Sequence, residues 1–127
     1  MKLEAGRDVL VVEDDPEINE LVGAYVALAG FRYRGVFDGG SAIRQAAEEP
    51  PALILLDVML PDMSGFEVCL ELRGAPATRH IPIVFLSALD GEPEKNRGRN
   101  AGAAEYLVKP FDPDQLIRTI RRHILSE

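Results

Sequence analysis

Residues 52–57 read Ala-Leu-Ile-Leu-Leu-Asp, a continuous apolar run that ends in a carboxylate. An unbroken aliphatic run is typical of a strand that is buried on both faces of a parallel sheet. Two further apolar runs, at 9–12 and 83–86, also lead directly into polar residues. These three runs predict the central strands of a parallel sheet. Because ligands of such sheets bind beyond the carboxyl ends of the strands, the polar residues that follow the runs are candidates for a site.

Helix signals alternate with these runs along the rest of the chain. Asp15, Pro16 and Glu17 supply an N-cap, a proline suited to the first turn and an acid near the positive helix end. We expect that helix to end at Gly30 and to bury the apolar stripe Ile18, Leu21, Val22, Tyr25 and Leu28. Further strands are expected at 32–37 and 106–108, and further helices at 41–49, 64–73, 92–101 and from Asp112 onward.

Five strands that alternate with five helices predict an α/β fold, in which a single doubly wound parallel sheet is covered by helices on both faces. The chain has 127 residues, enough for one domain with its own core. Its formal net charge is −7, with 14 Lys and Arg against 21 Asp and Glu. This sign argues against direct contact with nucleic acid, which needs cations to displace counterions, and against docking on anionic membranes.

The rest of the composition excludes several kinds of site. One cysteine, Cys69, excludes an internal disulfide and is expected to pack inward, and the two histidines, His80 and His123, are expected at the surface. We find no signal-peptide pattern. The longest uncharged, mostly apolar stretch, 21–31, is shorter than the roughly 20 residues that span a bilayer. We therefore expect a soluble, cytoplasmic protein.

Polar side chains collect where the predicted strands end. A hydroxyl, an ammonium group and three carboxylates should meet at one sheet edge, from Glu13, Asp14, Asp57, Ser87 and Lys109. Two carboxylates about 5 Å apart repel each other by roughly 3 kcal/mol at an effective dielectric constant of about 20. Lys109 supplies one compensating charge. Because the ligands on offer are all oxygens, Mg²⁺ is the best candidate for the rest.

Asp57 differs from the other two acids because it is fixed at the tip of an aliphatic strand. A fixed carboxylate beside a metal ion can attack phosphorus and form an acyl phosphate. The metal and Lys109 would neutralise the phosphoryl oxygens during transfer, and Ser87 could donate a hydrogen bond to one of them.

These residues resemble the response-regulator receiver domains of two-component signalling. Each motif alone is weak, but the ordered set is specific, and it covers the chain from about Val9 to Leu125. The matching pieces are Val11-Val12-Glu13-Asp14, Asp57 with Leu60-Pro61 and Gly65, Ser87-Ala88, and Tyr106 with Lys109-Pro110-Phe111. The resemblance implies a flavodoxin-like strand order of 2-1-3-4-5 and one receiver domain over 1–127, with its core at about 8–125.

The resemblance also implies how phosphate and metal are held. Asp57 matches the phospho-accepting aspartate, which takes its phosphoryl group from the phosphohistidine of a sensor histidine kinase or a phosphotransfer protein. Asp14, Asp57 and the backbone carbonyl of Met59 match the protein ligands of Mg²⁺, for which Mn²⁺ is a substitute. Glu13 matches an acid that acts mainly through metal-bound water.

A switch and its readout follow from the same resemblance. Ser87 and Tyr106 match a pair in which the hydroxyl moves toward the phosphoryl group and the ring turns inward. Lys109 matches the lysine that binds the phosphoryl group, and its bond to Pro110 is expected to be cis. The fourth helix, fifth strand and fifth helix would present the result to a downstream effector protein or domain. Some members also dimerise there on phosphorylation, which is one expectation here.

Two features depart from the family pattern. The predicted helix at 92–101 has polar residues, Asn96 and Arg99, where aliphatic ones are usual. Either this helix is short or mobile, which we favour, or the readout face is unusual. Met59 and Leu89 should flank the phosphoryl site, and these apolar side chains cannot orient an attacking water. We therefore expect a long-lived phosphoryl group.

Two alternative functions remain open at this point. A phosphohydrolase of the haloacid-dehalogenase type also uses an aspartyl nucleophile, but it needs a second carboxylate two residues later, where this chain has Met59. A pseudo-receiver that only binds partners typically lacks the acidic pair or the lysine, and this chain has both. We thus expect a signalling domain that catalyses only its own phosphorylation and dephosphorylation.

Overall fold

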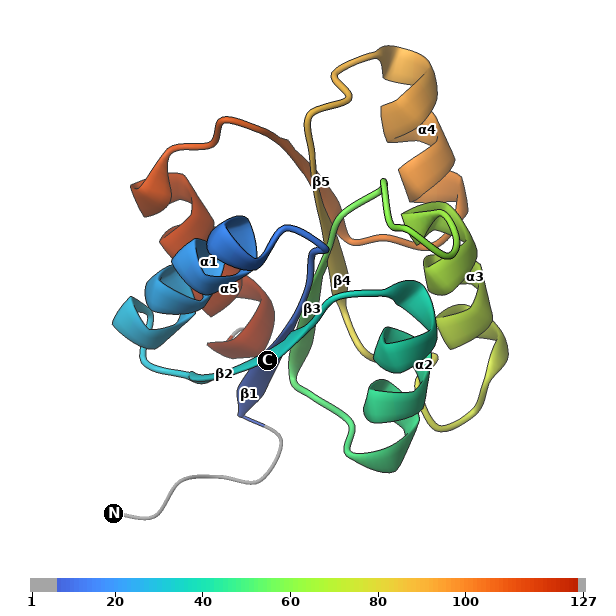
Figure 1. Ribbon diagram of the computed structural model, residues 1–127, viewed down its shortest axis with the longest axis horizontal. Helices are drawn as coiled ribbons and strands as arrows, with labels where there is room; N and C mark the ends of the chain where they lie inside the picture. Colours follow the sequence, from blue (N-terminus) through green and yellow to red (C-terminus); the bar gives the residue numbers. More distant parts are fainter. Residues whose placement is uncertain (1–6, 126–127) are drawn as a thin grey trace.

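The computed structural model describes residues 7–125. They contain one five-stranded sheet, in which all paired strands are parallel. The strand order β2-β1-β3-β4-β5 confirms the predicted topology, and β1, β3 and β4 occupy its centre (Figure 1). Apart from single residues at some ends, the strands fall where the sequence predicted them. They are β1 (Asp8–Val12), β2 (Arg32–Val36), β3 (Leu53–Leu56), β4 (Ile83–Ser87) and β5 (Glu105–Val108).

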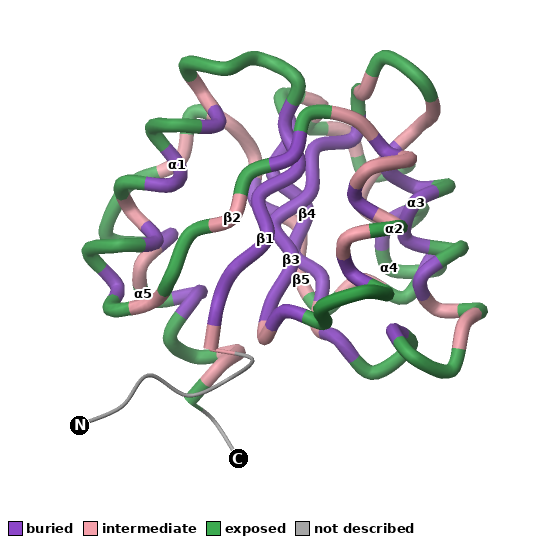
Figure 2. The backbone as a smooth tube through the Cα atoms, turned by 60° about the horizontal axis from the view of Figure 1, so that its bottom comes forward, coloured by how far each residue is buried: buried purple, intermediate pink, exposed green. Residues whose placement is uncertain are grey.

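Five helices cover the sheet in two layers, α1 and α5 on one face and α2, α3 and α4 on the other (Figure 1). Each layer encloses its own apolar cluster, and the central strands are buried between the two (Figure 2). Exposed residues lie on the helices, on the connecting loops and along β2 (Figure 2). The helices are α1 (Pro16–Leu28), α2 (Gly39–Glu48), α3 (Gly65–Gly74), α4 (Glu92–Asn100) and α5 (Pro113–Leu125). None of them is long and apolar enough to cross a membrane.

The buried face of α1 differs from the predicted stripe. Leu21 and Leu28 are largely exposed, at 51% and 67%, so that part of the prediction was wrong. The helix buries Val22, as predicted, and with it Asn19, Gly23 and Val26. The physical reason is that main-chain carbonyls at the sheet edge accept hydrogen bonds from the Asn19 amide, which turns this polar residue inward.

The helix starts are built in different ways. Asp15 caps α1 by accepting the N–H groups of Glu17 and Ile18, as predicted. α3 has a reciprocal capping box between Ser64 and Glu67, a pattern that stabilises a helix start. α4 begins after Gly91 without a side-chain cap. The helix predicted at 92–101 is present. Of these three helices, it alone has no side chain that caps its first turn.

Candidate functional site

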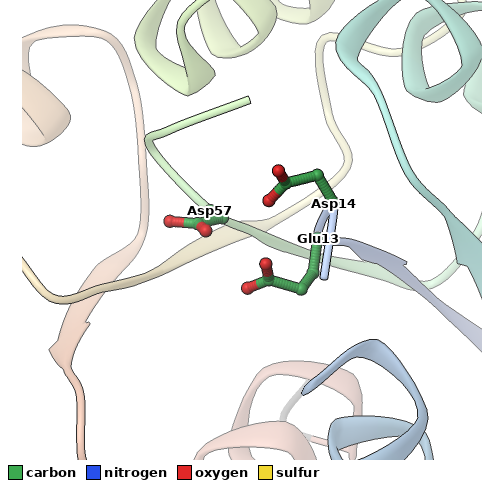
Figure 3. A group of neighbouring side chains, drawn as sticks. All are labelled: Glu13, Asp14 and Asp57. Carbon is green, nitrogen blue, oxygen red and sulfur yellow. The ribbon is translucent and has the colours of Figure 1, made fainter. Parts of the chain in front are cut away.

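Three carboxylates meet at the carboxyl edge of the sheet. Glu13 and Asp14 follow β1, and Asp57 follows β3, its neighbour in the sheet. One carboxylate oxygen from each lies within 4.8 Å of the others, and the three side chains group together in Figure 3. Asp57 is 9% exposed and Glu13 5% exposed, whereas Asp14 faces solvent. The sequence predicted this convergence.

Lys109, the residue that follows β5, contacts two of these acids. Its Nζ donates to Glu13 Oε1 at 2.6 Å and lies 3.5 Å from Asp57 Oδ2. Burial disfavours the ammonium group, but the hydrogen bond to Glu13 and the negative charge of Asp57 outweigh that penalty and raise the pKa of Lys109. Lys109 therefore stays charged and balances one of the three negative charges.

The donor set fits a hard divalent cation. Three carboxylates with one balancing ammonium leave an excess of negative charge among groups that are mostly buried. The oxygens lie close enough to share one ion, and carboxylates are the ligands that Mg²⁺ prefers. Asp14 is the most exposed of the three acids, so an ion from solvent can reach the cluster on the side of Asp14.

Ser87 and Tyr106 meet through a backbone segment after β4. Ser87 is buried, and its Oγ accepts the N–H of Leu89 at 3.1 Å. The Tyr106 hydroxyl donates to the carbonyl of the same Leu89 at 2.8 Å, and its ring packs against Phe85. The hydroxyls of Ser87 and Tyr106 thus both bond the backbone of Leu89, the first at its N–H and the second at its carbonyl.

This geometry has a counterpart among known proteins. The family model described as "Response regulator receiver domain" matches residues 9–121. The chain belongs to this family. The match covers the acid cluster, Ser87, Tyr106 and Lys109 together, and it decides against the phosphohydrolase alternative at the level of family.

Three relatives illustrate the relationship. The receiver domain is 40% identical to the transcriptional regulatory protein GltR of Pseudomonas aeruginosa over 91% of its length and 48% of GltR. It is 41% identical to the phosphate regulon regulator PhoB of Escherichia coli over 91% of its length and 50% of PhoB. The receiver domain of the P. aeruginosa sensor histidine kinase PA1611, solved with magnesium in its active-site cleft, superposes with a TM-score of 0.87 at 34% identity, covering 96% of this chain and all of that one.

The receiver domain spans between a quarter and a half of the length of the curated relatives that it matches. It is a signalling module of two-component response regulators, and receiver domains of this family bind Mg²⁺ at their acidic pocket and act between histidine kinases and effectors.

The remaining predicted site residues surround the acid cluster. The Lys109–Pro110 bond is cis, as expected. The Met59 N–H lies 3.4 Å from Asp57 Oδ1, and the residue is 64% exposed. Met59 and Leu89 line one groove beside the site, together with Val58, Leu60, Ser64, Phe66, Glu94 and Arg97.

Predictions for residues outside the site were partly right. Cys69 is buried, as expected, and burial raises the pKa of its thiol. His80 is exposed, but His123 is half-buried, with Nε2 2.8 Å from Glu105 Oε1, so its placement at the surface was wrong. Burial alone would raise the pKa of Glu105, but hydrogen bonds from His123 and Arg122 lower it overall.

Two contacts near the site were missed from the sequence. Asn19 bonds the main chain of the acid loop, and Asp62 accepts the N–H groups of Gly39 and Gly40 at 2.8 Å each. These N–H groups lower the pKa of the Asp62 carboxyl. The only signal for Asn19 was a polar residue inside an apolar helix face. Asp62 gave no signal because its partners lie 22 and 23 residues away.

Proposed function

We propose that this receiver domain accepts a phosphoryl group on Asp57 from the phosphohistidine of a sensor histidine kinase or phosphotransfer protein. The observation that carries the proposal is the position of the Asp57 carboxylate. It is nearly buried at the end of β3, shares a cluster with Glu13 and Asp14, and lies 3.5 Å from the ammonium group of Lys109. A carboxylate fixed beside positive charge is suited to attack phosphorus.

Asp14, Asp57 and the backbone carbonyl of Met59 would hold Mg²⁺ directly, and Glu13 would act through a water molecule. Mn²⁺, another hard cation, would substitute. When bound, the cation would neutralise charge on the phosphoryl oxygens and so lower the barrier to transfer.

The protein's own groups carry the remaining steps. A carboxylate oxygen of Asp57 forms the new P–O bond while the P–N bond of the donor breaks and the imidazole leaves with the electron pair. Lys109 contributes fixed positive charge toward the incoming oxygens, and its hydrogen bond to Glu13 holds the ammonium group in place. The product is an acyl phosphate, and its later hydrolysis returns the free carboxylate.

Ser87 and Tyr106 would transmit the effect of phosphorylation from Asp57 to the start of α4. A phosphoryl group brings up to two negative charges and three acceptor oxygens, and the Ser87 hydroxyl would donate to one of them. Turning toward the phosphate weakens the bond between Ser87 and the Leu89 N–H, which stands at 3.1 Å in the present state. Because Tyr106 bonds the carbonyl of Leu89, the ring and the start of α4 would shift together.

The partners proposed are protein partners. A kinase or phosphotransfer protein would dock at the acid cluster, and an effector protein or domain would read the α4–β5–α5 face, where a phosphorylation-dependent dimer is a further prediction. Direct contact with nucleic acid or membranes is not part of the proposal, because the net charge is −7. A cytoplasmic location suits these partners.

Phosphate incorporation tests the proposal. Wild type incubated with acetyl phosphate and Mg²⁺ should gain one phosphoryl group by intact-protein mass spectrometry, and Asp57→Asn should gain none. Asp15→Asn is the matched control, because Asp15 is a nearby aspartate that caps α1, and it should still be phosphorylated. No incorporation into folded wild type, together with no binding of the phosphate mimic beryllofluoride, would contradict the proposal and favour a pseudo-receiver.

A further inference from the structure

Asn19 links the main chain of the acid loop to the two strands beside it. It lies on α1 and is fully buried. Its Nδ2 donates to the carbonyl of Glu13 at 2.9 Å and to that of Val36, at the end of β2, also at 2.9 Å. The Val11 carbonyl lies farther away, at 3.4 Å. One side chain therefore ties the loop that carries Glu13 and Asp14 to the neighbouring strand.

Tyr33 fixes the orientation of this amide. Its hydroxyl donates to Asn19 Oδ1, which leaves Nδ2 facing the carbonyls. Two glycines leave room for the ring and hydroxyl. A Cβ at Gly23 would lie 2.7 Å from the Tyr33 ring, and one at Gly35 would lie 2.6 Å from Asn19 Oδ1. The surrounding sequence thus accommodates this one arrangement of tyrosine and asparagine.

The bond to Glu13 acts where the site most needs restraint. The Glu13 carbonyl belongs to the peptide that joins Glu13 to Asp14, so holding it fixes both acid side chains at their shared backbone. The N–H side of Glu13 is held as well, because it donates to the same Val36 carbonyl at 3.2 Å. Three carboxylates within 4.8 Å repel one another. Without restraint, the loop that carries Glu13 and Asp14 would move away from Asp57.

We infer that Asn19 is a positioning residue for the metal-binding acids, oriented by Tyr33 and acting through the peptide between Glu13 and Asp14. The inference rests on the proposed function, because it assigns Asn19 to the Mg²⁺ site of that function. Asn19 itself lies behind the acid loop and acts only through the main chain.

A purely structural role makes a different prediction. If Asn19 only joins β1 to β2, its loss lowers stability and leaves Mg²⁺ affinity unchanged. If it positions the acids, its loss weakens Mg²⁺ binding beyond what the lower stability explains. Thr78 is a matched control, because it is also buried and its hydroxyl donates to a main-chain carbonyl, that of Leu72, at 2.7 Å. Thr78 precedes β4 and so lies toward the opposite edge of the sheet from the acids.

Calorimetric titration with MgCl₂ tests the inference on wild type, Asn19→Ala, Tyr33→Phe and Thr78→Ala. Asn19→Ala should weaken Mg²⁺ binding about 10-fold, as removing an outer support of a metal site does. The Mg²⁺ concentration that half-saturates phosphorylation by acetyl phosphate should rise by the same factor, with little change in the rate at saturating Mg²⁺. Tyr33→Phe, which keeps the ring, should weaken binding less, and Thr78→Ala should bind like wild type.

The outcomes separate the two proposals. Wild-type affinity in folded Tyr33→Phe and Asn19→Ala, or an equal loss in Thr78→Ala, would overturn the inference and leave the proposed function standing. If Asn19→Ala does not fold, Tyr33→Phe decides alone, since it removes only the hydroxyl. A folded wild-type chain that binds no Mg²⁺ would overturn the proposed function and this inference with it.

Discussion

Two loops leave neighbouring strands at the same sheet edge, and they are held in different ways. The β3–α3 loop, 57–64, begins with Asp57, the proposed phosphoryl acceptor, and is held by several contacts. Asp62 binds two N–H groups at the start of α2, Met59 bridges to Ser64, and the Gly65 N–H donates to the Val58 carbonyl at 2.7 Å.

The β4–α4 loop, 88–91, follows Ser87 and has weaker anchors. The bonds of Leu89 to Ser87 and Tyr106 hold its first half, and an ion pair of Lys95 with the exposed Asp90 holds its end. α4 lacks a side-chain cap and buries only Gly98. The loop after Asp57, the proposed acceptor, is thus held by more contacts than the loop after Ser87, a difference that predicts a lower local stability for the second loop.

Glycine-to-alanine substitutions at the starts of α3 and α4 should show the largest difference between the two loops. A Cβ at Gly65 would lie 2.2 Å from the main-chain carbonyl of Asp57, a backbone group that cannot turn aside as a flexible side chain can. Gly65→Ala should therefore lower the free energy of unfolding by about 3 kcal/mol. At Gly91 the same atom would meet only the tip of the flexible Glu94 side chain, so Gly91→Ala should cost less than about 1 kcal/mol.

Urea denaturation of both variants measures these changes. Equal losses in Gly65→Ala and Gly91→Ala would contradict the view that the two loops differ in rigidity.

The lifetime of the phosphoryl group sharpens the comparison at the side chains that flank the site. Met59 on the β3–α3 loop and Leu89 on the β4–α4 loop are both apolar, so neither orients an attacking water. We expect loss of label over much longer than seconds in wild type with Mg²⁺. Met59→Gln should shorten the lifetime by about 10-fold, or about 1.4 kcal/mol in the barrier, because its amide can hold a water molecule.

Leu89→Gln should have a smaller effect on this lifetime, since its loop can carry the new amide away from the site. The lifetime is measured as release of radiolabelled phosphate. Loss of the label from wild type within seconds would refute the expectation of a long-lived phosphoryl group.

Helix capping gives a smaller effect of opposite sign in the two regions. Ser64→Ala removes the capping box of α3 and should lower stability by about 1 kcal/mol. Gly91→Ser adds a capping hydroxyl to α4, where none is present, and should raise stability by a few tenths of a kcal/mol. Thermal and urea unfolding measure both, and a gain from Ser64→Ala would contradict the assignment.

The pH dependence of Asp62 should be the smallest effect. Two N–H groups lower the pKa of this carboxyl from its ordinary value of 3.8, so its ionised form stabilises the fold. That contribution is present above the ordinary pKa and is lost as the pH falls through the lowered folded pKa. Wild type should be more stable than Asp62→Asn near neutral pH, and the gap should close in acid.

Urea unfolding between about pH 3 and 6 checks this prediction. Asp90→Asn serves as the control for removing an exposed carboxylate from the other loop. A gap between wild type and Asp62→Asn that did not change over this range would contradict the assigned role of Asp62.

The sequence predicted the features that depend on local pattern. Apolar runs such as 53–56 gave the strands, and the rule that parallel strands end at one edge brought Glu13, Asp57 and Lys109 together. The inward turn of Asn19 was missed because it depends on carbonyls of β1 and β2, which no periodicity in α1 reveals. The tie between Asp62 and the start of α2 was missed for the same reason, whereas the Ser64–Glu67 spacing could have predicted the α3 cap.

Chemical trapping of the acyl phosphate identifies the residue that carries the phosphoryl group. Borohydride reduces an aspartyl phosphate to homoserine, so the phosphorylated residue can be located by peptide mass spectrometry after treatment with acetyl phosphate and Mg²⁺. We expect homoserine at position 57 alone, and none when Mg²⁺ is removed by a chelator. Homoserine at Asp14 or another aspartate, with Asp57 unmodified, would contradict it.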